Sequence, residues 1–211
     1  MKITKFGHCC LLIEEQALRI LTDPGSYSTG QETAKNIDVI LITHEHQDHL
    51  HIDSLKNVLK NNPQAKVITN KGVAILLDKE KIEYSLVEDT QSITEKNVLI
   101  EGFGQKHAVM YSTLPRVDNT GYFIANRLFY PGDALTNPNK GVEILALPVA
   151  GPWLKLSEAI DYAKEINPKV CFPVHESILK EPGATHRIPP MILEPLGIKF
   201  QVIEEGKSAE F

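Results

Sequence analysis

The sequence has no hydrophobic run that could cross a membrane and no excess of positive charge. The longest uncharged apolar stretch, residues 144–154, has 11 residues and contains two prolines and a glycine, whereas a membrane-spanning helix needs ~20 apolar residues. Lys and Arg number 22 against 27 for Asp and Glu, a net charge of −5. We therefore expect no membrane partner, and the overall charge does not favour a surface that coats nucleic acid.

Cysteine is also scarce, with only Cys9, Cys10 and Cys171 in the chain. A small odd number is typical of a reducing compartment rather than of a disulfide framework. Cys9 and Cys10 are adjacent and would point to opposite faces of a strand, so we interpret them as free thiols, and we expect Cys171 to pack in the core. The first apolar stretch stops at Glu14 with no small-residue cleavage site after it. We therefore expect no signal peptide and a cytoplasmic location.

The pattern of apolar residues predicts a layered protein of strands and helices. No internal repeat or linker-like segment divides the chain, so we expect a single domain over residues 1–211. Helices are expected to begin near residues 53–54, after the capping residue Asn70, and at the capping residue Ser157. Strands are expected at 2–6, 9–14, 18–21, 39–42, 67–69, 97–103, 122–125, 127–130, 144–147 and 170–174. Because some strands meander and others are separated by helices, the fold class is α/β with mixed sheets.

Histidine is concentrated in one short segment. Four of the eight histidines lie within residues 44–51, directly after the expected strand 39–42. His44 and His46 are two apart, so in an extended segment they project to the same side and could bind one metal ion. Asp48 and His49 follow an expected bend and could turn toward a second ion. Imidazole and carboxylate ligands without thiolate suit Zn²⁺, Mn²⁺ or Fe²⁺, with affinity favouring zinc and availability able to override it.

Three further candidate ligands each follow the end of an expected strand. His107 comes after 97–103, Asp133 after 127–130, and His175 after 170–174. Alone, Asp133 could be a turn aspartate and His175 a hydrogen-bonded core histidine. Together they disfavour the interpretation of 44–51 as a loop of solvated histidines, because they complete a seven-ligand set at one edge of the sheets.

The order of these residues resembles the metallo-β-lactamase superfamily. The resemblance implies an αββα four-layer sandwich, with two mixed β-sheets face to face and helices outside. It also implies two divalent ions that share a hydroxide, Zn²⁺ first and Mn²⁺ or Fe²⁺ as alternatives. The implied ligands are His44, His46 and His107 for one ion, Asp48, His49 and His175 for the other, and Asp133 as a bridge.

Shorter segments are similar to one branch of that superfamily. Residues 6–13, 147–153 and 172–175 resemble the branch that includes L-ascorbate-6-phosphate lactonase. The resemblance implies a metal-dependent hydrolase of a small ester, lactone or phosphoester, with Asp48, Asp133 and His8 as catalytic residues. Gln47 stands where an aromatic residue is common, and Trp153 lies in a segment that differs among members. Both departures leave the substrate open.

Several other residues have two interpretations. His8 could contact substrate or supply a proton, or it could be a buried histidine bonded to backbone. Asp23 could orient the histidine loop or a ligand imidazole, or it could be a turn aspartate. Arg116 could bind an anionic group or be solvated. Trp153 could form an apolar wall of the pocket or pack on the helix that follows. We expect His51 at a helix start and His186 in a loop.

The same sequence features also fit other functions. A single-domain nuclease or phosphodiesterase acting on RNA or DNA is the main alternative, although the chain is short, acidic and without an added nucleic-acid-binding domain. Antibiotic hydrolysis could be a side activity, and a redox role is less expected because there is no companion flavin domain. A catalytically silent metal-binding protein is the alternative outside enzymes. The expected partner is a small-molecule substrate, and a homo-oligomer is compatible with the sequence.

Overall fold

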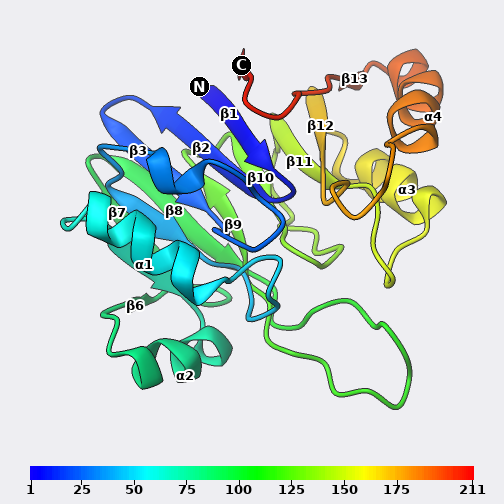
Figure 1. The fold of residues 1–211 in the computed structure, drawn as a ribbon. Helices are drawn as coiled ribbons and strands as arrows, with labels where there is room; N and C mark the ends of the chain where they lie inside the picture. The colour runs from blue at the N-terminus through cyan, green and yellow to red at the C-terminus, as the bar shows by residue number, and fades with distance from the viewer.

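Two β-sheets pack face to face in the computed structural model, which describes residues 1–211. Each sheet has seven strands, and helices cover the outer face of each sheet (Figure 1). The two chain termini lie close together, at the same end of the sandwich. This arrangement confirms the predicted αββα fold class.

The first sheet is antiparallel on one side and parallel on the other. Strands β14, β1, β2 and β3 pair antiparallel, and strands β3 to β6 pair parallel. In spatial order the strands are β14 (Ser208–Glu210), β1 (Lys2–Gly7), β2 (Cys10–Glu15), β3 (Leu18–Thr22), β4 (Val39–Leu41), β5 (Lys66–Thr69) and β6 (Ser85–Leu86).

The second sheet repeats this division. Strands β13 to β10 pair parallel, and strands β10 to β7 pair antiparallel. The order is β13 (Lys199–Phe200), β12 (Val170–Val174), β11 (Ile144–Pro148), β10 (Leu128–Tyr130), β9 (Gly121–Ile124), β8 (Val98–Phe103) and β7 (Ser92–Glu95). Both sheets are therefore mixed, as predicted.

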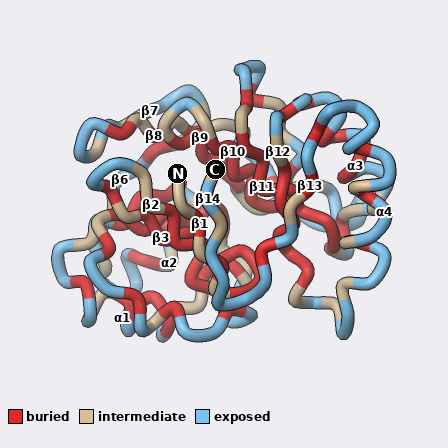
Figure 2. Tube along the Cα trace, turned by 90° about the horizontal axis from the view of Figure 1, so that it is seen from above, coloured by how far each residue is buried: buried red, intermediate tan, exposed pale blue.

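Apolar side chains fill three layers. The largest cluster, 21 buried residues that include Ile20 and Phe172, lies between the two sheets. One smaller cluster lies between each sheet and the helices that cover it. Figure 2 shows the buried segments running along the strands. The helices are α1 (Ile52–Asn61), α2 (Lys71–Glu80), α3 (Leu156–Ile166) and α4 (Ala184–Leu193), with short 3₁₀ turns η1 (Gln31–Thr33) and η2 (Glu194–Leu196). None of the helices has the length and apolar character that crossing a membrane requires.

Most local predictions agree with the structure, and two are wrong. Asn70 caps α2 by accepting the backbone N–H of Val73. Ser157 does not cap α3, because the helix begins at Leu156 with Lys155 as its N-cap residue, and Glu158 accepts the backbone N–H of Lys155. His186 lies on α4 rather than in a loop. Proline is disfavoured inside a helix, so the prolines at positions 189 and 190 argue against a helix here when the sequence is read alone.

All three cysteines are free and buried, which confirms the free thiols expected at Cys9 and Cys10 and the core position expected for Cys171. Cys9 lies in the turn before β2 and joins the cluster between the sheets. Cys10 begins β2 and packs in the cluster under α1 and α2. The two thiols therefore occupy opposite faces of the first sheet, and Cys171 packs in the layer beneath α3 and α4.

Candidate metal centre

The predicted ligands meet at one edge of the sandwich. The loops that follow β4, β8, β10 and β12 lie at this edge, together with the turn between β1 and β2. Open α/β sheets bind ligands at the carboxyl ends of their strands. The structure brings together all seven predicted ligands, which are His44, His46, Asp48, His49, His107, Asp133 and His175.

The first group of side chains comes from the loops after β4, β8 and β10. His44, His46, His107 and Asp133 each offer one ligand atom, and these atoms lie within 4.8 Å of one another. Nε2 of His44 is 3.2 Å from Nδ1 of His46. Nε2 of His107 is 3.3 Å from Oδ2 of Asp133. The two histidines at positions 44 and 46 do face the same point, as their spacing predicts.

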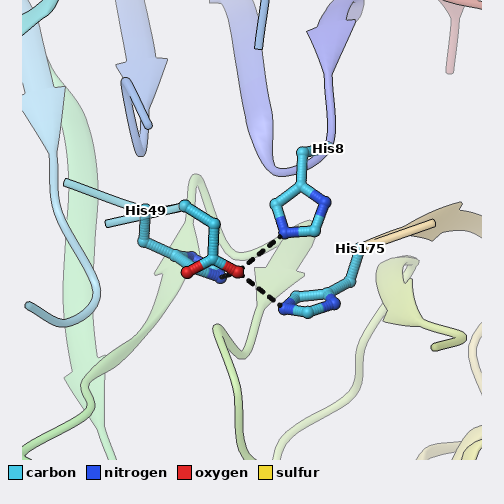
Figure 3. A group of neighbouring side chains, drawn as sticks. His8, His49 and His175 are labelled. Atoms are coloured by element: carbon cyan, nitrogen blue, oxygen red, sulfur yellow. Dashed lines mark hydrogen bonds and ion pairs between the residues drawn. The ribbon is translucent and has the colours of Figure 1, made fainter. Parts of the chain in front are cut away.

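The second group contains one residue more than expected. His8, Asp48, His49 and His175 also offer ligand atoms within 4.8 Å of one another. Figure 3 shows the three histidines turned toward one another, with His8 and His175 facing the same carboxylate. Oδ2 of Asp48 is 3.1 Å from Nε2 of His8 and 3.5 Å from Nε2 of His175. His8 therefore lies among the ligands and is fully buried.

Asp133 lies between the two groups. Its Oδ1 is 3.1 Å from Nε2 of His49, and its Oδ2 is 2.9 Å from Nε2 of His175. The same Oδ2 faces His107 in the first group. Two carboxylate oxygens on one side chain can therefore reach ligand atoms of both groups.

Unpaired buried atoms show that these residues fit a metal. Nε2 of His49, His107 and His175 and Oδ1 of Asp133 are buried, and although they lie 2.9–3.3 Å from one another's groups they form no well-aligned hydrogen bond. A buried polar atom without a partner costs ~1–3 kcal/mol. Divalent ions would pair all of these atoms at once, and imidazole and carboxylate are ordinary zinc ligands.

The charges of the centre depend on one another. Burial opposes the ionised form of Asp133, but the neighbouring His49 and His175 outweigh it and hold the pKa of the carboxyl well below its usual value. Burial likewise lowers the pKa of His175, but Asp133 and Asp48 raise it to about 9. Burial dominates at His8 and lowers its pKa to about 4. His8 is therefore neutral at pH 7, while His175 carries a proton that a metal would displace.

Asp23 contacts the histidine loop directly. Its side chain is fully buried, and its Oδ2 accepts hydrogen bonds from Nδ1 of His49 at 2.7 Å and from the hydroxyl of Thr43 at 2.7 Å. Its Oδ1 accepts the backbone N–H of Thr43 at 2.8 Å, and Tyr130 donates its hydroxyl to Oδ2 at 2.5 Å. These contacts place Asp23 where it can orient the ring of His49, and that role stays a prediction.

Trp153 lies against the ligands. Its Nε1 donates a hydrogen bond to Oδ2 of Asp133 at 2.9 Å, and its ring centroid is 5.6 Å from that of His107 and 5.9 Å from that of His175. Trp153 therefore lies next to the candidate ligands, and its role as a wall of a substrate pocket stays a prediction. Its hydrogen bond to Asp133 is a contact that the sequence did not predict.

The remaining candidates lie outside the ligand groups. Arg116 is exposed, and its guanidinium donates to the backbone carbonyls of His107 and Lys106. It therefore braces the β8–β9 loop. His51 lies at the start of α1, as expected, where it is the N-cap residue. His186 lies with Nε2 3.4 Å from Oε1 of Glu176.

Sequence analysis missed a thiol beside the centre. Sγ of Cys9 lies within 4.8 Å of ligand atoms of His49 and Asp133. Burial, followed by the negative charge of Asp133, raises the pKa of this thiol well above its usual value. Its one signal in the sequence is the position next to His8, because the turn between β1 and β2 carries both side chains to this edge.

Comparison with known proteins agrees with the fold and the ligand pattern. Residues 2–175 match the family model of the β-lactamase superfamily domain. Protein Rv0786c of Mycobacterium tuberculosis is 34% identical over 216 residues, with 100% of both chains covered. A UPF0173 protein of Pyrococcus abyssi is 31% identical, with 83% of each chain covered. A UPF0173 metal-dependent hydrolase of Carboxydothermus hydrogenoformans is 26% identical, with 83% of this chain and 84% of the relative covered.

Solved structures share the fold at low sequence identity. Igni18, a metallo hydrolase of Ignicoccus hospitalis, superposes with a TM-score of 0.77 at 20% identity, over 100% of this chain and 98% of the other. An isothiocyanate hydrolase from Delia radicum gut bacteria superposes with a TM-score of 0.76 at 13% identity, over 100% and 99%. Such likenesses establish the fold, and a fold does not select a substrate. From the family match, the chain belongs to the β-lactamase superfamily, among relatives that include the UPF0173 metal-dependent hydrolases.

Proposed function

We propose that this protein is a metal-dependent hydrolase with a dinuclear centre, acting on a small ester, lactone or phosphoester. The observation that carries the proposal is the position of Asp133, whose Oδ2 faces ligand atoms of both groups and whose Oδ1 faces His49 of the second group. Relatives named as metal-dependent hydrolases support the same reaction class.

The ligand roles follow from the two groups. His44, His46 and His107 would hold one ion, Asp48, His49 and His175 the other, and Asp133 would contact both. Bound divalent ions supply Lewis acidity and lower the pKa of a coordinated water toward ~7. The donor set favours Zn²⁺, with Mn²⁺ and Fe²⁺ as alternatives. The protein contributes the fixed positions of its donors, because most of these side chains are buried and packed against one another.

His8 has a different role from the other histidines in this proposal. Its ring is neutral at pH 7 because its pKa is about 4, so it is not a charged acid at that pH. Nε2 of His8 is 3.1 Å from Oδ2 of Asp48, and the ring stacks edge-on against Tyr27, which is 52% exposed. We place His8 where it can hold Asp48 in position or hydrogen-bond a substrate that enters past Tyr27.

The surroundings of the centre favour a small molecule over nucleic acid. A long loop between β8 and β9 starts beside the centre and projects from the body of the protein (Figure 1). It exposes Val109, Met110, Tyr111 and Leu114. Apolar side chains suit a substrate with an apolar part, whereas nucleic-acid sites are rich in Lys and Arg. The lactonase-like branch fits a small substrate of this kind.

Metal content and turnover together test the proposal. Elemental mass spectrometry on protein purified without chelator or affinity metal should find close to two equivalents of zinc, manganese or iron per chain. A panel of model lactones, phosphomonoesters and phosphodiesters should reveal metal-dependent turnover. His46→Ala and Asp133→Ala should abolish that turnover, and His51→Ala, which changes a histidine outside the ligand groups, should retain it.

Two outcomes would contradict the proposal. Close to zero metal, with no uptake on titration, would mean that the ligands do not bind metal in solution. Wild-type turnover by folded His46→Ala or Asp133→Ala would exclude this centre as the site of the chemistry. Salt-sensitive cleavage of single-stranded nucleic acid without turnover of small substrates would instead favour the nuclease alternative.

A further inference from the structure

Lys5 is buried in the interior of the protein, which is unusual for a lysine. It lies on β1 of the first sheet, is 1% exposed, and points toward the second sheet. Its Nζ donates a hydrogen bond to the backbone carbonyl of Pro173 at 2.9 Å and forms an ion pair with the carboxylate of Glu176. Buried charges persist only when they are paired and hydrogen-bonded. Burying this charge therefore costs free energy, and the partners of Lys5 show which segment of the chain it holds in place.

The two partners lie on either side of a proposed metal ligand. Pro173 is two residues before His175, and Glu176 is the residue directly after it. One side chain from the first sheet therefore grips the chain before and after His175 at the end of β12. His175 itself has a φ of +69°, which is uncommon for a residue other than glycine. A backbone in that region persists only where its surroundings hold it.

Other contacts fix the same segment. The backbone N–H of His175 donates to the carbonyl of His8 at 3.2 Å, and the N–H of His8 donates to the hydroxyl of Ser177 at 2.8 Å. These bonds fasten the β1–β2 turn to the end of β12. Lys5 adds to these bonds a charged side chain that reaches the same segment from the first sheet.

We propose that Lys5 and Glu176 are positioning residues that hold His175 at the metal centre, an inference that rests on the proposed metal-binding function. Lys5 does not touch the ligand groups, so it acts through the backbone of residues 173–176. Glu176 extends the connection to α4, because its Oε1 is 3.4 Å from Nε2 of His186. The pair therefore links β1, the end of β12 and α4 behind His175.

The surroundings of the pair explain why removing it would let His175 move. A cavity of about 450 Å³ lies beside it, lined by Lys5, Glu176 and His186 among others. Without the Lys5 bonds, this hollow would give residues 173–176 room to move. Partners that orient a metal ligand from outside are typically worth 10–100-fold in metal affinity.

The test is a measurement of two metal affinities on the full chain. Co²⁺ is titrated into metal-free protein against a competing chelator, and the visible absorption of Co²⁺ follows each ion. We expect Lys5→Met to weaken the affinity for one of the two ions by ~10-fold or more and to leave the affinity for the other within about twofold of wild type. Lys2→Met is the matched control, since Lys2 is on the same strand with a side chain 44% exposed. It should leave both affinities unchanged.

A second variant keeps the inference testable if Lys5→Met does not fold. Glu176→Gln retains the volume and one oxygen acceptor of the side chain. We therefore expect a smaller, several-fold loss of affinity for the same ion only. Equal weakening of both ions, or unchanged affinities in a folded variant, would mean that the pair is only structural and would overturn the inference. Absence of metal uptake by the wild type would instead contradict the proposed function itself.

Discussion

Nδ1 of His49 lies 2.7 Å from Oδ2 of Asp23, and neither side chain is exposed to solvent. The hydrogen bond uses one ring nitrogen and leaves Nε2 to face Asp133 at 3.1 Å. A carboxylate behind a histidine fixes the tautomer and orientation of its ring. Asp23 thereby selects which nitrogen of His49 is available to a metal.

Asp23→Asn should weaken metal binding without removing a ligand. The amide keeps the size of the side chain but loses the charge that stabilises a proton on Nδ1 of His49. We expect the affinity for the ion at His49 to fall ~10–100-fold, measured by chelator competition. Tyr130→Phe removes another hydrogen bond to the same carboxylate and serves as the comparison. An affinity equal to wild type in Asp23→Asn would show that the contact does not orient the ring.

Trp153→Phe tests the contact between the indole and Asp133. The substitution keeps an aromatic wall next to His107 and His175 but removes the hydrogen bond to Oδ2 of Asp133. A hydrogen bond to a charged group contributes ~1.5–3 kcal/mol, so the metal-free variant should unfold at lower denaturant concentration. Turnover should fall several-fold if the indole also holds Asp133 in place. Unchanged stability of the metal-free form would mean that the bond is absent in solution.

Metal binding should release protons and should tighten as pH rises. In the metal-free protein the pKa of His175 is about 9, above its usual value of ~6.5. The stabilisation from its proton is complete below pH ~6.5 and is lost as pH rises through about 9. Metal must displace this proton, so this one group should increase the affinity by up to ~10-fold per pH unit as pH rises toward 9, and its contribution should end there.

Proton release can be measured directly. Calorimetric titration of metal in buffers that differ in ionisation enthalpy counts the protons released at each pH. The contribution of His175 to this count should disappear above pH 9, where that histidine has already lost its proton without metal. A metal affinity independent of pH between 6.5 and 9 would contradict this prediction.

Phe172→Ala should destabilise the sandwich at its centre. Phe172 is fully buried between the two sheets, three residues before His175. Removing a buried phenylalanine side chain costs ~3–5 kcal/mol through lost transfer energy and the cavity left behind. Denaturant unfolding should show this loss, and Leu196→Ala, at a position 56% exposed, should change stability by ~0.5 kcal/mol or less. A loss below ~1 kcal/mol at Phe172 would mean that the two sheets are not closely packed there.

Much of the architecture could be predicted because its signals are local. The strand at 170–174 has the predicted bounds, and the hairpin around Asn126 forms as predicted, with Ala125 and Asn126 both at positive φ. These elements come from runs of apolar residues and from one turn residue. The two-residue strands β6 and β13 and the proline-containing helix α4 were not predicted. Their local preferences are weak or adverse, so packing against the rest of the chain decides them.

The sequence by itself determined the types of the candidate ligands and their order along the chain, because His and Asp residues after the ends of strands can be read directly from the sequence. Only the tertiary structure decided which side chains share a point in space. Asp133 between the two groups, His8 among the ligands, Cys9 beneath them and Lys5 behind His175 all depend on how the two sheets face each other. Contacts such as Lys5 with Glu176, 171 positions apart, leave no periodic trace in a sequence, since they are made by packing rather than by neighbouring residues.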